Sequence, residues 1–180
     1  MESLRGHLLV AAPGLVDPNF HRTVVLLGEH SDDGALGVVL NRESDVSVAD
    51  AVPELDELLA ADGVVHVGGP VQPQALVVLA EFSEPERASA LVLDAIGFLP
   101  SEVDPDELGV LGRARVFAGY AGWGPGQLEN ELAEESWIVE PALAEDVFTA
   151  EPGGLWNAVL RRKGGAFAVL ASIPPDPTLN

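Results

Sequence analysis

The sequence predicts an α+β fold in which short strands and helices follow one another irregularly. Short apolar runs rich in β-branched residues are scattered along the whole chain, and two of them are joined by a strong turn signal. The helical segments between them lack the regular strand–helix–strand rhythm of a parallel sheet. No repeat, linker or break in composition divides the 180 residues, so we expect one domain over residues 1–180.

Runs of Val, Leu and Ala predict the strands of the first half of the chain. They lie at residues 8–12, 23–28, 35–40, 64–67 and 75–82. Asp33-Gly34 separates the second run from the third, and glycine adopts the positive φ of a tight turn, so residues 23–41 predict a β-hairpin. Both arms of this hairpin are almost continuously apolar, which indicates a position inside a covered sheet and not at its edge.

Apolar spacing predicts the helices. A stripe from Val48 to Leu59 predicts a helix capped at Asp50, with Pro53 in its first turn and Gly63 at its end. Further helical segments are expected at residues 104–111, 125–135, 143–148 and 155–163, and further strands at 91–93, 114–118, 137–139 and 167–171. The proline-rich tail that begins at Pro174 is expected to fray.

The charge of the chain argues against several kinds of partner. There are 29 acidic and 9 basic residues, which give a net charge of −20 at pH 7. Because nucleic acids are bound by Lys and Arg side chains that neutralise phosphates, we expect no direct contact with nucleic acid and none with an anionic membrane. The one basic run, Arg161-Arg162-Lys163, is interpreted as the positively charged end of a helix.

Recognisable reaction machinery is missing from the sequence. The chain has no cysteine, and it contains no P-loop, dinucleotide fingerprint or Gly-x-Ser-x-Gly elbow. The four histidines do not stand at metal-ligand spacing, and His66, inside an apolar run, is expected to be a hydrogen-bonded core residue. We therefore predict no catalytic residue, no metal and no cofactor. With no signal peptide or membrane-spanning run, we expect a cytoplasmic location.

The most unusual segment is the glycine-rich stretch at residues 119–129. Four glycines in eight positions indicate a backbone that needs their conformational freedom, and Tyr120 and Trp123 lie among them. Amide groups at the start of the following helix favour an anion, a role that Glu129 already fills in part. Two interpretations stay open: a tight corner whose aromatic residues fill the core, or a corner that also binds a ligand or partner through Tyr120, Trp123 and Gln127.

Three other polar or glycine-rich positions complete the candidate binding site. Gly68 and Gly69 allow an abrupt turn or a close approach of two backbones. Asp17 lies in a proline-punctuated loop, where its side chain either binds a ligand or caps its own turn. Asn41, beside Arg42 at the end of the hairpin, either binds a polar group or holds a loop in place.

Taken in order, these segments resemble the YqgE/AlgH family of bacterial proteins. The resemblance covers nearly the whole chain and consists of residues 8–13, 17–20, 23–30, 34–42, 68–71 and 119–129 together with Trp137 and Trp156. One departure is visible: the strand that follows Gly-Gly-Pro-Val often ends in Leu-His in the family, whereas here it ends in Leu79-Ala80. No role of that imidazole is therefore carried over to this chain.

The resemblance implies a mixed, mostly antiparallel sheet curled into a small barrel-like shape with flanking helices, and it implies a cytoplasmic location. It brings no agreed activity and no cofactor. Family members are often labelled transcriptional regulators, but the sequence contains no helix-turn-helix with a basic recognition helix.

The sequence leaves a ranked set of functions. The first is a non-enzymatic binding or regulatory domain that acts through protein contacts without binding DNA directly, with exposed Tyr120 and Trp123 as anchors. The alternative is a small-molecule-binding protein or an enzyme whose pocket is built from the glycine-rich loops, with Asp17 or Glu129 as a base. A direct transcription factor and a purely structural role rank below these two.

Overall fold

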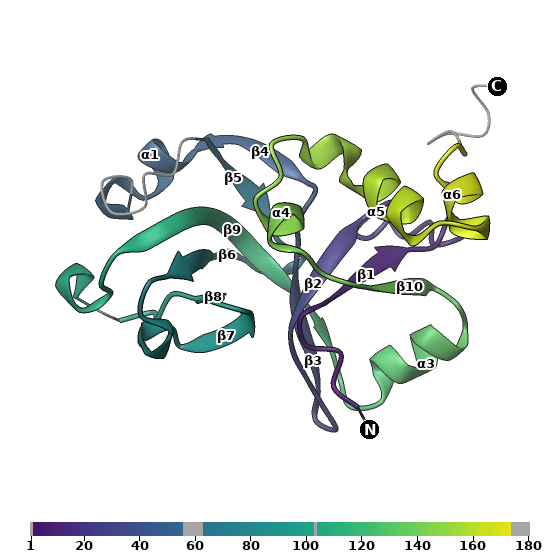
Figure 1. Ribbon diagram of the computed structural model, residues 1–180, viewed down its shortest axis with the longest axis horizontal. Helices are drawn as coiled ribbons and strands as arrows, with labels where there is room; N and C mark the ends of the chain where they lie inside the picture. The colour runs from purple at the N-terminus through teal and green to yellow at the C-terminus, as the bar shows by residue number, and fades with distance from the viewer. Residues whose placement is uncertain (1, 56–62, 103, 174–180) are drawn as a thin grey trace.

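A computed structural model describes residues 2–55, 63–102 and 104–173 of the chain (Figure 1). Its strands are β1 (His7–Ala11), β2 (Val24–Ser31), β3 (Gly34–Val39), β4 (Glu43–Ser47), β5 (Val64–Val67), β6 (Val71–Phe82), β7 (Ala90–Leu93), β8 (Ile96–Phe98), β9 (Leu111–Trp123) and β10 (Trp137–Pro141). The helices are α1 (Val48–Ala51), α3 (Gln127–Ala133), α4 (Ala144–Val147), α5 (Leu155–Lys163) and α6 (Ala166–Leu170), with short 3-10 turns η1 (Pro85–Arg87), η2 (Pro105–Glu107) and η3 (Pro152–Gly154).

The strands form one mixed sheet that is almost entirely antiparallel. Its order is β10-β1-β2-β3-β9-β6-β8-β7, and β5 joins the side of β9 in a parallel pairing with β4 on its outer edge. Within the described residues β10 and β7 do not pair with each other, so the sheet stays open and is not closed into a barrel. The α+β class and the mostly antiparallel sheet expected from the sequence are confirmed.

Strand β9 connects the two halves of the molecule. Its first part pairs with β6 and β5, and its last residues pair with β3. Figure 1 shows α1 and β4 to β8 on the left of the view and β1, β10, α3, α5 and α6 on the right, and β9 runs from the left group to the centre, where its last residues meet β3.

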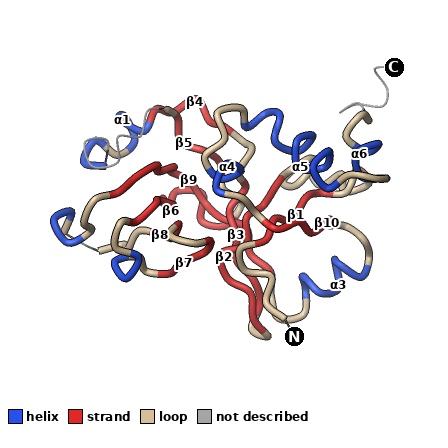
Figure 2. The backbone as a smooth tube through the Cα atoms, in the orientation of Figure 1, coloured by secondary structure: helices blue, strands red, loops and turns tan. Residues whose placement is uncertain are grey.

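Helices cover both faces of the half that contains the hairpin (Figure 2). Leu8 and Val10 belong to a core cluster shared with α5, whereas Leu9 and Ala11 belong to a second cluster shared with α3. Successive side chains of a strand point to opposite faces, so a strand buried on both faces has no polar positions. The hairpin predicted at residues 23–41 is confirmed as β2 and β3, and it lies in the interior of the sheet.

The sequence predictions fail at the closing segment. Residues 167–171 were expected to form a strand, but they lie in α6 and the turn that follows it. Phe167, Leu170 and Ala171 all pack against the cluster shared with α5, and this i, i+3, i+4 spacing is that of a helix face. A short apolar run does not distinguish the two structures by itself.

Two helix boundaries also differ from the prediction. The first helix begins at Val48, because the Oγ of Ser47 accepts a hydrogen bond from the Asp50 backbone N–H at 3.1 Å and Ser47 is therefore the cap. The described helix α1 ends at Ala51, and the positions of the prediction at residues 56–62 and in the tail at 174–180 lie outside the described residues. The acidic helix expected at 104–111 is only the turn η2, and Leu111 already begins β9.

Among the described residues no helix is long and apolar enough to span a bilayer. The single domain over residues 1–180 remains a prediction.

Candidate functional site

The two glycine-rich segments meet backbone to backbone. Gly69 has φ +157°, and a Cβ at this position would overlap the carbonyl group of Tyr120. Gly119 has φ +74°, and a Cβ there would overlap the carbonyl oxygen of Gly69. The Gly68 N–H donates to Ala118 O at 2.8 Å. The structure therefore brings together Gly68, Gly69 and Tyr120, and the glycines are needed for close approach of the two chains.

Trp123 is not the exposed anchor that was expected. The residue is only 6% exposed, and its ring packs against those of Phe20 and Trp137, with ring centroids 6.2 and 5.9 Å away. The indole N–H groups of Trp123 and Trp137 both donate to Oε1 of Glu131, at 3.4 and 3.1 Å. At Trp123 these contacts match the first interpretation, in which the aromatic side chain of the glycine-rich corner fills the core and its N–H group is hydrogen-bonded.

Gln127 and Glu129 are also held by neighbouring groups. Oε1 of Gln127 accepts a hydrogen bond from the Gly124 N–H at 3.0 Å, which closes the turn before α3. Glu129 Oε1 lies 2.7 Å from Nε2 of His30, and this hydrogen bond lowers the pKa of the Glu129 carboxyl group. A carboxylate with a lowered pKa is a weaker base, so the arrangement argues against Glu129 as a catalytic base.

Asn41 and Arg42 hold a loop in place. The Asn41 side chain accepts from Val24 N at 2.9 Å and donates to Arg22 O at 2.8 Å. The Arg42 guanidinium donates to three carbonyl oxygens of the loop before β2, at 2.8 to 3.2 Å. Asp17 caps its own turn by accepting from Asn19 N at 2.8 Å. For Asn41 and Asp17, the observed contacts therefore match the interpretations in which Asn41 holds a loop in place and Asp17 caps its own turn.

The predicted site residues do not gather in one pocket. Tyr120 and Trp123 are three positions apart in β9, so they face opposite sides of the sheet and belong to different core clusters. Tyr120 lines a groove of about 710 Å³. Gly69 lines a separate cavity of about 220 Å³ together with Arg42. The described structure therefore does not bring these residues to one cavity, although Tyr120 does line a substantial groove, and their role in binding stays a prediction.

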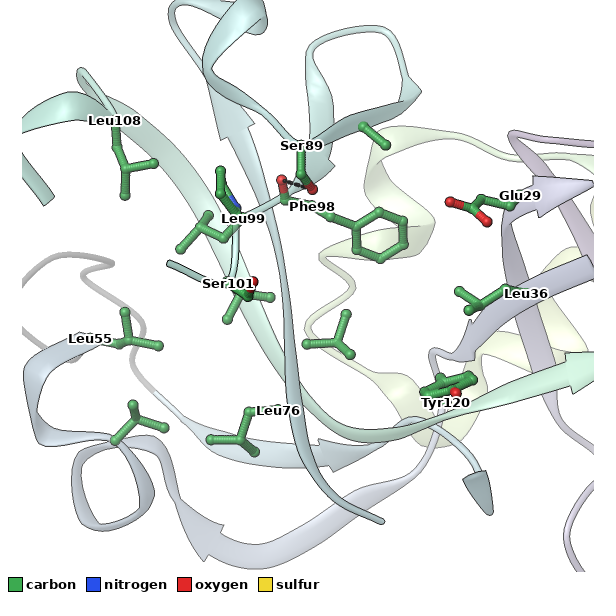
Figure 3. Close-up of a pocket in the computed structure, with 15 residues that line it drawn as sticks. Glu29, Leu36, Leu55, Leu76, Ser89, Phe98, Leu99, Ser101, Leu108 and Tyr120 are labelled. Atoms are coloured by element: carbon green, nitrogen blue, oxygen red, sulfur yellow. Dashed lines mark hydrogen bonds between the residues drawn. The ribbon is translucent and has the colours of Figure 1, made fainter. Parts of the chain in front are cut away.

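This groove is the main concave feature that the fold creates at Tyr120 (Figure 3). Its walls come from β2, β3, β6, β7, β8, β9 and the loop after β8, and they are mostly apolar. The larger apolar side chains are Leu36, Leu55, Leu76, Phe98, Leu99 and Leu108. Leu76 is 42% exposed, and because it adjoins the other apolar residues of the groove it extends one continuous apolar surface that is open to a ligand.

Few polar groups face the groove. Ser89 donates to the carbonyl oxygen of Phe98 at 3.2 Å, so its hydroxyl is already used. Glu29 is exposed, and among the described residues its carboxylate makes no ion pair. Figure 3 shows the Glu29 side chain pointing across the groove towards the ring of Phe98. The groove thus combines an apolar wall with one unneutralised carboxylate.

Neither Glu29 nor Phe98 was predicted from the sequence, and the one local signal near them is Gly28, which precedes Glu29 in the chain. The pairing of β2 with β3 shifts register between Leu27 and Glu29, which marks a bulge at Gly28. A Cβ on Gly28 would lie 2.6 Å from the Phe98 ring, so the glycine allows this ring to lie against β2. A glycine inside an apolar strand indicates such a bulge or close approach.

Comparisons with known proteins agree with this architecture. An AlgH-like family model matches residues 8–168. A UPF0301 protein of Streptomyces coelicolor is 46% identical over 187 residues, which cover 100% of this chain and 97% of the relative. One from Thermobifida fusca is 43% identical and covers 99% and 96% of the two chains.

Two solved structures share the fold. The crystal structure of a protein from Corynebacterium diphtheriae superposes with a TM-score of 0.85 at 31% identity, covering 96% of this chain and 94% of that one. The solution structure of the AlgH protein from Pseudomonas aeruginosa superposes with a TM-score of 0.71 at 30% identity, covering 96% and 95%. With the family model matching most of its length and relatives matching all of it, this chain belongs to the AlgH-like family.

Proposed function

We propose that this protein is a non-enzymatic binding domain that acts through protein contacts, and that the 710 Å³ groove receives a cationic, apolar segment of a partner protein. The observation that carries the proposal is the pairing of exposed Leu76 and the apolar wall with the carboxylate of Glu29. An amphipathic helix inserts apolar side chains into such a groove and places its charged residues at the rim.

Charge supports this choice of partner. The net charge of −20 attracts a segment rich in Lys and Arg and accelerates its encounter with the protein. The same field repels DNA and RNA, so the proposal includes no direct nucleic-acid binding. The regulatory role and the cytoplasmic location expected from the sequence stay part of the proposal.

The test compares charge and apolar variants with matched controls. Leu76→Glu removes the apolar contact, and Leu143→Glu is its control because Leu143 is 45% exposed and does not line the groove. Glu29→Lys reverses the charge at the groove, and Glu134→Lys makes the same change in net charge at the end of α3.

The probe is a fluorescent synthetic amphipathic peptide of leucine and lysine, measured by anisotropy, with a leucine–glutamate peptide as its comparison. Wild type and both controls should bind the cationic peptide, whereas Leu76→Glu and Glu29→Lys should weaken it about tenfold or more, a change equivalent to about 1.4 kcal/mol. Equal binding by all five proteins contradicts the proposal. Tight binding of duplex DNA at physiological salt contradicts the part of the proposal that excludes direct nucleic-acid binding.

A small-molecule-binding protein is the second candidate, because 710 Å³ lies in the range of ligand pockets, roughly 300–1,000 Å³. An uncharged apolar dye distinguishes the two. Saturable dye binding that Leu76→Glu abolishes and Glu29→Lys leaves unchanged, without binding of the cationic peptide, favours this second function.

A further inference from the structure

A second cavity lies on the outer part of the sheet, around a buried histidine. His66 in β5 is 3% exposed, as the sequence predicts for a core residue. Neither Nδ1 nor Nε2 has a hydrogen-bond partner of normal geometry among the described residues, and the backbone of Val64 makes only a weak contact that raises the pKa of the imidazole slightly. Buried polar groups in folded proteins are nearly always paired, and each exception asks for an explanation, such as a ligand.

Strand pairing places two opposite charges beside this imidazole. Glu43 of β4 is directly opposite His66 in the antiparallel pair. On the other side His66 is the partner of Phe117 in β9, and Arg115 lies two residues earlier. Residues two apart in a strand share a face, and so do directly paired residues. Glu43, His66 and Arg115 therefore lie on one face of three adjacent strands, with the imidazole in the middle.

These three side chains line a common cavity of about 360 Å³. Val64, which lies two residues before His66 in β5 and shares its face, contributes apolar wall, and Phe148 and Pro152, which flank the segment between α4 and η3, border the cavity as well. Figure 1 shows this segment beside β4 and β5. The cavity is separate from the 710 Å³ groove, since the two sets of lining residues have no member in common.

The cavity holds one negative and one positive side chain, Glu43 and Arg115, that do not form an ion pair with each other in the described structure. Burial and the nearby Arg115 lower the pKa of His66 to about 4, so the imidazole is neutral at pH 7, with one donor and one acceptor nitrogen. The Arg115 guanidinium donates to Val147 O at 3.2 Å, which leaves most of its five N–H groups available. Among the described residues Glu43 and Arg115 do not come within ion-pair distance of each other.

We propose that this cavity binds a small zwitterion of the α-amino acid class, with its carboxylate on Arg115, its ammonium group on Glu43 and its apolar side chain against Val64 and Phe148. Arginine is suited to bidentate recognition of a carboxylate. A simple anion would meet Glu43 and the overall charge of −20, and a simple cation would meet Arg115. His66 can donate to the carboxylate or accept from the ammonium group, which would satisfy one of its unpaired nitrogens.

The test uses L-valine and its two half-molecules. Isovalerate is valine without the ammonium group, and isobutylamine is valine without the carboxylate. With histidine labelled at ¹³Cε1, each of the four histidines gives one imidazole signal, and the His66→Gln variant assigns the one from His66. Valine should shift this signal saturably, and each half-molecule should bind at least about tenfold more weakly, because each lacks one charge-assisted contact.

Substitutions that remove one charged group each show which side chain holds which end of the ligand. Glu43→Gln should weaken valine about tenfold and leave isovalerate unchanged or tighter, whereas Arg115→Gln should weaken both. Asp45→Asn is the matched control, since it makes the same change in net charge on the same strand without lining the cavity. If Arg115→Gln fails to fold, the Glu43→Gln variant decides alone, because Glu43 is exposed at its strand edge.

Two results overturn the proposal. One is isovalerate binding as tightly as valine, which would make the cavity a simple anion site. The other is the absence of any saturable shift of the His66 signal at tens of millimolar valine. Neither result bears on the groove, whose proposed peptide binding is measured with different residues.

Discussion

His66 is a buried group whose protonation the fold opposes, and this makes stability depend on pH in a predictable direction. Its pKa falls from 6.5 to about 4 because of burial first and Arg115 second, while Glu43 and the backbone of Val64 act in the opposite sense. Replacing it by leucine removes both the titration and the two unpaired nitrogens. We predict that His66→Leu is more stable than the wild type, and that its advantage grows as the pH falls.

The magnitude follows from proton linkage. Above pH 6.5 the imidazole is neutral in both the folded and the unfolded state, so its titration has no effect there. Between pH 6.5 and 4 the unfolded chain binds a proton that the folded chain does not, so the wild type loses about 1.4 kcal/mol per pH unit. Over this window the loss is about 3 kcal/mol. At pH 7.5 only the unpaired nitrogens count, which is worth about 1–3 kcal/mol.

The measurement is urea unfolding of the wild type and the variant at pH 7.5, 6.0 and 4.5, with the free energy of unfolding compared at each pH. The carboxylates that titrate in both proteins cancel in the difference. His66→Gln is the control: it does not titrate and should show the same slope, but it keeps polar atoms in the cavity and should be less stable than His66→Leu. A difference between wild type and His66→Leu that does not change with pH refutes the reasoning.

Two further predictions concern the glycine-rich crossing and the tryptophan pair. Gly69→Ala should lower the free energy of unfolding by more than about 2 kcal/mol, because its Cβ would overlap the backbone of β9, whereas Gly153→Ala, with no atom within 4 Å of the added Cβ, should change it by less than about 0.5 kcal/mol. Equal melting temperatures for the two variants would contradict this account. Glu131→Ala should lower the free energy of unfolding by about 1–3 kcal/mol and shift the tryptophan emission, because it leaves the Trp123 and Trp137 indoles without their acceptor. Glu131→Gln is the control, since it keeps an acceptor oxygen. An equally large effect of both variants would show that the shared hydrogen bond is unimportant.

Local sequence patterns predicted an element correctly where a turn sequence or a clear apolar periodicity determines the structure. Asp33-Gly34 and the apolar arms around it predict β2 and β3 in their observed places. The helix predicted at residues 155–163 has the bounds of α5, because the glycine at position 164 ends it with φ +80°. At 167–171 the apolar run was too short for its period to separate helix from strand.

The candidate site was less predictable, and Tyr120 and Trp123 show why. The sequence placed the end of the strand at residue 118, so the alternation of faces could not be applied to the two aromatic residues. In the structure β9 continues to Trp123, and an odd spacing within a strand sends the two side chains to opposite faces. One therefore enters the core and the other reaches the groove.

The amino-acid order alone was enough to establish the α+β class, the hairpin, the strongly negative charge and the resemblance to the AlgH-like family, because each of these depends on residues that are neighbours in the chain or on composition. Folding decided which distant residues meet: Gly69 with the backbone of β9, Phe98 with Gly28, and His66 with Glu43 and Arg115. These contacts depend on the register between strands, and a shift of one residue would turn every side chain of a strand to the other face. No local pattern records that register, so the groove and the histidine cavity emerge only from the folded sheet.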